Sequence, residues 1–249
     1  MVGNIGDIQF VSFLEAVIDL LEEKNLLEEK NKEPFMNALY DIYMVSQEKT
    51  AMILSLKKLL LDFKIFRLNL TGHKFDMTSL CNLNLSMCNL TNVNLAHSDL
   101  ENINLSFSIL NGANLAGAKL QNANLKGAQL RGANLRSAHL SRANFEDADL
   151  REVRLGAADL NSTNFLKADL TGARLHGADL SDANFQYANL SRAILNSSIL
   201  SNTNFEHANI EGADFTNCTG LSVDKIKKAD FVSPFQFPGS INKNSFHET

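Results

Sequence analysis

The chain has 249 residues, and its 23 Lys and Arg against 28 Asp and Glu give a formal net charge of −5. A balance this mild favours neither a nucleic-acid binder nor a heavily acidic protein that imitates nucleic acid. The three cysteines form no C-x-x-C pair, which is typical of a reduced cytosolic protein. The N-terminus lacks a signal-peptide pattern, and the longest uncharged run of the N-terminal part, 50–56, is too short to cross a bilayer. We therefore expect a cytoplasmic protein without a membrane span.

Residues 1–64 carry the pattern of amphipathic helices. The first helix follows from apolar residues spaced at i, i+3, i+4 and i+7, namely Phe10, Phe13, Leu14, Val17, Ile18 and Leu21. Pro34 suits the start of a second helix, and a third covers about 48–63. We expect three or four short helices that form an N-terminal cap, because a stack of repeats exposes an unpaired edge at its end. Whether these helices only cap that edge or also dock a partner stays open.

A repeat of five residues fills the middle of the chain, which we assign to a domain over 65–218. From Leu70 to Phe215 every fifth residue is Leu, Phe or Ile, and these thirty residues are termed centres here. Neither a helix nor one straight strand keeps side chains five apart on the same side. The residue two before a centre is small or apolar almost throughout, with His73 before Phe75 as a departure, and Gly, Asn and Ser are frequent two after it. Each pentad therefore predicts a short extended piece with two inward side chains, followed by a corner.

A longer period of 20 residues lies over the pentads. The Phe centres are spaced by 20 and are Phe145, Phe165, Phe185 and Phe205. The residue before the centre in the same column is always Asn, at Asn84, Asn104, Asn124, Asn144, Asn164, Asn184 and Asn204. Twenty residues are four pentads, so we expect a four-sided coil, about 7.5 coils in all. Like residues would then form ladders, in which Asn amides hydrogen-bond and Phe rings stack between coils.

The motif A-[N/D]-[L/F]-x-x, seen as "ANFED", "ADLRE", "ADLSD" and "ANFQY", resembles that of the pentapeptide repeat proteins. The resemblance implies a right-handed, four-sided β-helix, and the handedness comes from the resemblance alone. The fold class we expect is thus mainly β, a solenoid with an α-helical N-terminal cap and a short C-terminal capping helix. The family is abundant in bacteria, cyanobacteria above all, and this chain looks like one of its many members without a known activity.

The last part of the chain, 219–249, predicts a second cap. Ser222 suits an N-cap, and Lys227 and Lys228 suit the last turn of a helix over about 222–230. The tail "FVSPFQFPGS" that follows contains two prolines, which make it a poor partner for a sheet. Its three Phe residues either fold back on the last coils or join two copies of the chain. We therefore expect a monomer or a homodimer held by the C-terminal tail.

Motifs of catalysis are missing from the sequence. The six His residues are scattered, and there is no P-loop, no G-x-S-x-G and no cluster with the spacing of metal ligands. A closed coil filled with Leu, Phe and Ala also leaves no cavity for a substrate. We predict no enzyme, and no catalytic, cofactor-binding or metal-binding residue.

Two kinds of outward side chain are candidates for a partner surface. Apolar residues predicted to point outward are Met87, Phe107, Ile194 and Ile199, and pairs of them could begin a contact site. Residues 102–145 hold no acid but five bases, of which Lys126 and Arg131 are the candidates. Since these bases fall on successive corners, we expect a belt around the coil. A belt offers no continuous track for a phosphate backbone, so we do not expect nucleic-acid binding.

These observations lead to a non-enzymatic binding or scaffold protein. A rigid solenoid presents its faces and caps, and we expect these to meet a protein partner that the sequence does not identify. The alternative is a regulator of DNA gyrase, since some proteins of the resembled family act on gyrase by imitating DNA. Such mimicry needs a continuous acidic surface, whereas residues 70–217 mix 14 acids with 11 bases.

Overall fold

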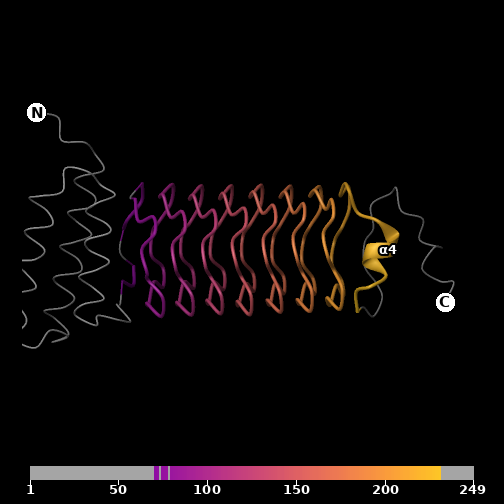
Figure 1. Cartoon of the computed structure of the whole chain (residues 1–249), viewed down its shortest axis with the longest axis horizontal. Coiled ribbons are helices and arrows are strands. Elements are labelled where there is room, and N and C mark those ends of the chain that lie inside the picture. Colours follow the sequence, from indigo (N-terminus) through magenta and orange to yellow (C-terminus); the bar gives the residue numbers. More distant parts are fainter. Residues whose placement is uncertain (1–69, 73, 78, 231–249) are drawn as a thin grey trace, which may run out of the picture.

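The structure is a computed structural model that describes residues 70–72, 74–77 and 79–230. These residues form a straight stack of coils with one short helix, α4 (Val223–Ile226), at its C-terminal end (Figure 1). The predicted helices within 1–64 and the tail beyond residue 230 lie outside the described residues. Within the described part no helix is long and apolar enough to cross a membrane.

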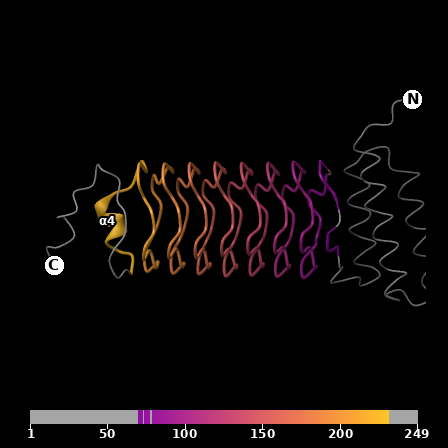
Figure 2. The same ribbon diagram turned by 180° about the vertical axis from the view of Figure 1, so that it is seen from behind.

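Successive coils are joined by parallel β-bridges between residues 20 apart. The bridges begin at Lys74 with Asn94 and continue to Ile199 with Thr219. Each of the four sides of a coil contributes a single bridge residue, so no longer strand forms, and the sides repeat in register along the stack (Figure 2). The predicted coil of four pentads and 20 residues is confirmed for the described residues.

Each corner is a tight turn that begins at a centre. The inward residue three positions after the centre donates its N–H to the centre's carbonyl, as Ala133 does to Leu130 at 2.9 Å. The residue two after the centre has a positive φ at all thirty corners from Gly72 to Asn217, which indicates a type II turn. Only eight of these residues are Gly, although the conformation costs other residues about 1–2 kcal/mol. The corners therefore need further support.

Hydrogen bonds between and within coils satisfy the backbone of a pentad. The N–H of a centre donates to the next coil, as in Leu90 to Ile109 at 2.7 Å. The residue before a centre donates to the previous coil, as in Asn114 to Val93 at 2.9 Å. The second corner residue also donates to the next coil, as in Gly112 to Arg131 at 3.0 Å, so only the N–H of the first corner residue, the one directly after the centre, lacks a backbone acceptor.

The Asn or Asp before the centre supplies that acceptor. Its Oδ1 accepts from the N–H two residues later, as Asn144 does from Glu146 at 3.1 Å. All 19 Asn and Asp residues at this position from 84 to 214 make the bond, at 2.9–3.4 Å. The polar residue of the repeat therefore closes the corner beside it, which is an Asx turn.

The interior is a column of centres and small residues, and all the described centres are buried. The rings of Phe145, Phe165, Phe185 and Phe205 stack with centroids 5.3, 4.7 and 5.4 Å apart and planes within 5°. Phe215, a centre two pentads after Phe205 and thus in another column, packs edge-on against Phe205 with ring centroids 5.7 Å apart. Stacked aromatic groups in a closed core combine buried area with favourable ring geometry.

Asparagine amides connect the coils on the outside. On the asparagine face, whose bridge residues run from Asn84 to Asn204, five Nδ2 groups donate to the Oδ1 one coil before, at 2.9–3.4 Å. A second, shorter ladder joins Asn94, Asn114 and Asn134 at 2.9 and 3.0 Å. This second ladder was not predicted from the sequence, although its three residues share the 20-residue phase.

The register resumes after α4, with one residue inserted. Ile226 is buried, and Ala229 donates to its carbonyl at 3.0 Å, as an inward residue does at a corner. Asp230 then bridges Asn209, 21 residues earlier. The described coil therefore continues beyond residue 218, and Ala229-Asp230 takes the place of the Ala-Asp step of a pentad.

A few ion pairs join neighbouring coils and sides. The guanidinium of Arg151 donates to both carboxylate oxygens of Asp149 at 2.8 and 2.6 Å, and lies 3.9 Å from Asp169. The hydrogen bond from Arg151 holds the pKa of the Asp149 carboxyl below its ordinary value, against the opposing effect of partial burial.

Replacing Phe165 by Ala should lower the free energy of unfolding by about 3–5 kcal/mol, since a buried ring stacked on both sides is lost. Urea unfolding of the two proteins measures the difference. Tyr187→Ala is the control, because that ring is 52% exposed and should contribute less than about 1 kcal/mol. A loss below about 1 kcal/mol for Phe165→Ala would contradict the stack.

Asn164→Ala should destabilise the protein more than Asn209→Ala, by about 1 kcal/mol. Both substitutions remove a corner bond, to Leu166 and Glu211 respectively. Only Asn164 also bonds along the ladder, to Asn144 at 3.0 Å and from Asn184 at 3.2 Å. Denaturant unfolding of both variants separates the ladder from the corner. Equal losses would show that the ladder contributes nothing.

Arg151→Ala should raise the pKa of Asp149, because the cationic hydrogen-bond donor is removed. A lowered carboxyl pKa stabilises the folded state above the ordinary carboxyl value of about 3.9, and the gain is lost as the pH falls through the lowered pKa. The stability difference between wild type and variant should thus be largest near neutral pH and vanish in acid. NMR titration of the Asp149 carboxyl and urea unfolding across the pH range check this, and a gap that persists in strong acid would refute it.

Candidate interaction surface

The described residues show no arrangement for catalysis that stands out from the repeat. No three His, Cys, Asp or Glu side chains among them lie close enough together to hold a metal ion. A polar hollow is lined by Gln121, Arg142, Asp159 and Asp179 among others, and it opens at a corner between coils. Burial raises the pKa of the Cys218 thiol, whose Sγ also donates to the Leu195 carbonyl, so this thiol stays protonated and unreactive.

Met87 and Phe107 stand at the same corner on successive coils and are 49% and 53% exposed. The Phe107 ring also covers the backbone of the next coil. A Cβ on Gly127 would lie 2.5 Å from the ring's Cε1, so a residue with a side chain does not fit beneath the ring as it stands. One face of the Phe107 ring is therefore covered by packing within the solenoid.

Ile194 and Ile199 occupy bridge positions on two adjacent faces of one coil and are 39% and 42% exposed. Because a corner separates the two residues, their side chains lie on different faces of the coil. Phe107 lies more than four coils away, about 20 Å along the stack. The structure does not bring the four apolar candidates together.

Lys126 and Arg131 both lie near acids of the following coil. The Nζ of Lys126 is 2.9 Å from Glu146, and this hydrogen bond raises the pKa of the lysine. Arg131 is 2.9 Å from Glu152. The two candidates are thus partly neutralised by carboxylates that the sequence analysis placed outside the basic stretch.

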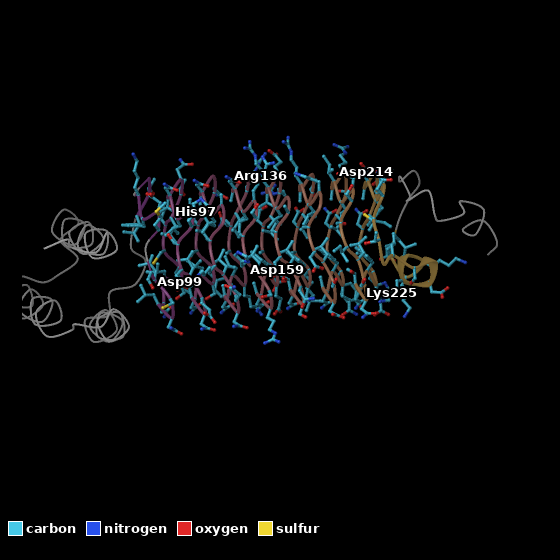
Figure 3. The ribbon with its side chains drawn as sticks, turned by 90° about the horizontal axis from the view of Figure 1, so that it is seen from above. His97, Asp99, Arg136, Asp159, Asp214 and Lys225 are labelled. Atoms are coloured by element: carbon cyan, nitrogen blue, oxygen red, sulfur yellow. The ribbon has the colours of Figure 1, made fainter. Side chains whose placement is uncertain are left out.

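Arginines gather on one face. The arginine face is defined by the bridge column from Lys74 through Arg154, Arg174 and Ile194 to Asp214, with its two flanking corners. Six of the seven arginines that the structure describes lie there, and Arg142 is the exception. Figure 3 shows Arg136 and Asp214 along one edge of the rod, away from Asp99 and Asp159. The belt predicted from the sequence is therefore only part of the arrangement. Bases of later coils extend one part of it into a stripe along the arginine face, namely Arg151, Arg154, Arg174 and Arg192.

The sequence matches the pentapeptide repeat family in eight overlapping copies that run from residue 88 to 217. A search of curated protein sequences returns no match. Among solved structures, a trypsin-treated form of QnrB1, a plasmid-mediated fluoroquinolone resistance protein, is similar with 20% identity, a TM-score of 0.60 and coverage of 70% of this chain and 91% of that chain.

Two further solved structures are similar in sequence. HetL, a pentapeptide repeat protein involved in heterocyst differentiation regulation in the cyanobacterium Nostoc sp. strain PCC 7120, is 33% identical over 70% of this chain and 87% of its own, with a TM-score of 0.39. A pentapeptide repeat protein of the Arabidopsis thaliana thylakoid lumen is 30% identical over 66% and 78%, with a TM-score of 0.23. The likeness to QnrB1 and the matched repeats imply a mainly β, right-handed β-helix. With half of its length matched and its coils built on the repeat, the chain belongs to the pentapeptide repeat family.

Proposed function

We propose that this chain is a non-enzymatic binding protein whose β-helix presents its faces to a protein partner. The observation that carries the proposal is the contrast between interior and exterior. The interior is filled by centres that are nearly all inaccessible to solvent, so the fold has no internal site to offer a substrate. The exterior is a set of flat faces, each with its own charge and polarity, held in register by the same backbone bonds.

Rigidity makes such faces suited to recognition. A surface that does not have to be ordered on binding loses little conformational entropy when a partner docks. Repeat solenoids are used in this way because their surfaces are extended and regular. The comparisons indicate no enzyme family. The three cysteines form no disulfide with one another, which fits a reducing compartment such as the cytoplasm.

Regulation of DNA gyrase by DNA mimicry is the alternative function. The likeness to QnrB1, at 20% identity, supports the fold and not the activity. An uninterrupted stripe of negative charge would favour mimicry, whereas the arginine face carries exposed cations on four successive coils.

Affinity capture tests the proposal. Full-length protein is used as bait in a lysate of its own cells, beside two variants that alter different surfaces, Met87→Lys/Phe107→Glu and Lys126→Glu/Arg131→Glu. A partner retained by wild type and lost in one variant alone, then reproduced with purified components, supports a binding face. Recovery of gyrase subunits, together with a changed supercoiling rate of purified gyrase, would favour the alternative. Failure to hold any protein under all conditions would count against both functions.

A further inference from the structure

Three successive bridge positions of the arginine face depart from the repeat. Of the 29 bridge positions from 74 to 214, 19 carry the Asn or Asp that closes the corner. Arg154, Arg174 and Ile194 are the longest run without one on any face of the described residues. None of these three side chains has an oxygen to accept the corner N–H, a hydrogen bond that most other pentads make. Local rules of a fold are broken in this way chiefly where function requires another side chain.

Four arginines of this face lack a carboxylate partner among the described residues. They are Arg136, Arg154, Arg174 and Arg192, and all four are exposed, whereas Arg131 and Arg151 form ion pairs. Arg154 and Arg174 are bridge partners, so their backbones lie about 4.8 Å apart. Like charges directly opposite one another destabilise a sheet. An anion bound between them would remove this repulsion and could be held by bidentate guanidinium bonds.

Ile194 adds an apolar contact to the charged contacts that the arginines offer a ligand. It follows Arg174 in the same bridge column and is 39% exposed, so a ligand that contacts both arginines also meets an apolar side chain. Asp214 comes next in the column, and Glu211 lies at its corner. These carboxylates end the positive stripe after four coils, which span three steps or roughly 14 Å, too short for a continuous track of phosphates.

We infer that the arginine face binds an acidic segment of another protein, with carboxylates on Arg154 and Arg174 and an apolar side chain on Ile194. The inference rests on the proposed function and names the face and the chemistry of its partner. An extended segment that runs along the solenoid axis advances about 3.3 Å per residue, so four or five residues cover the stripe. Arg136 and Arg192, at the two flanking corners, would add further contacts to such a segment.

Fluorescence anisotropy with the full-length protein tests the inference. The probe is a labelled peptide of about ten residues, mostly Glu with a central Leu, long enough to cover the stripe. Arg154→Glu/Arg174→Glu should weaken its binding by about tenfold or more, since two charge-assisted contacts are reversed. Ile194→Ala should weaken binding of the Leu peptide but should not weaken binding of a matched peptide with Ala in the centre. Circular dichroism and melting curves establish that the variants remain folded.

Lys119→Glu/Arg142→Glu is the matched control. It changes the net charge by the same amount, at two exposed bases that lie away from the arginine face and form no ion pair among the described residues. This control should change the affinity less than about threefold, as expected for distant charges screened by salt. Equal losses in the two double variants would show general charge attraction and overturn the inference. So would the absence of binding to wild type at low salt, or tighter binding of single-stranded DNA of matched charge.

The outcome is separable from that of the proposed function. If a partner captured from the lysate binds Arg154→Glu/Arg174→Glu as well as wild type, the chain is a binding protein but its face lies elsewhere, and this inference fails. If the acidic peptide binds as expected while the lysate yields no partner, the recognition chemistry of the face stands and the proposed function loses its support.

Discussion

The Asx hydrogen bond at the corner is the interaction on which the rest of the solenoid depends. A coil turns four times in 20 residues, and each turn leaves one N–H that neither the same coil nor its neighbours can satisfy through the backbone. An N–H left without an acceptor is costly where the corner is shielded from water. The Oδ1 of the preceding Asn or Asp accepts it, and so a short polar side chain is repeated through the chain. The same side chains, where they are Asn, have an amide left over for the ladder between coils.

This bond also explains which positions are free to vary. The centre and the small residue before it are set by the density of the core, and the position between them is set by the corner. Surface chemistry that differs from the repeat must then come from corner residues or from bridge positions that do without the Asx bond. Corner residues carry Met87, Phe107, Arg136 and Arg192, while Arg154, Arg174, Ile194 and Ile199 take bridge positions. Surface identity is therefore confined to a few places on a uniform scaffold.

Charge on such a scaffold has to be considered by face and by coil together. Along the chain, the bases of 119–142 precede a stretch rich in acids, which gives the impression of two oppositely charged segments. In space, some acids of the later stretch lie one coil from bases of the earlier one, and Lys126 with Glu146 and Arg131 with Glu152 neutralise each other. The unpaired arginines of the arginine face are fewer than the bases in the sequence, and they follow one another along the solenoid axis.

The sequence by itself determined the period, the number of sides, the residues of the core and the ladder residues of the Phe and Asn columns. It could do so because each inward position repeats at a fixed spacing, and a core of constant width admits only a narrow range of sizes. The acceptor role of the Asn and Asp residues is a local contact, two residues along the chain, that the repeat pattern alone did not reveal, whereas the pairing of charges between coils was decided by the tertiary structure. So were the gathering of arginines on one face and the return of the register at Asp230 after α4. Each of these depends on which side chains 20 or 21 residues apart come to lie side by side, and on where a corner directs them. Linear spacing identifies the column of a residue, but only the closed coil brings its neighbours within bonding distance.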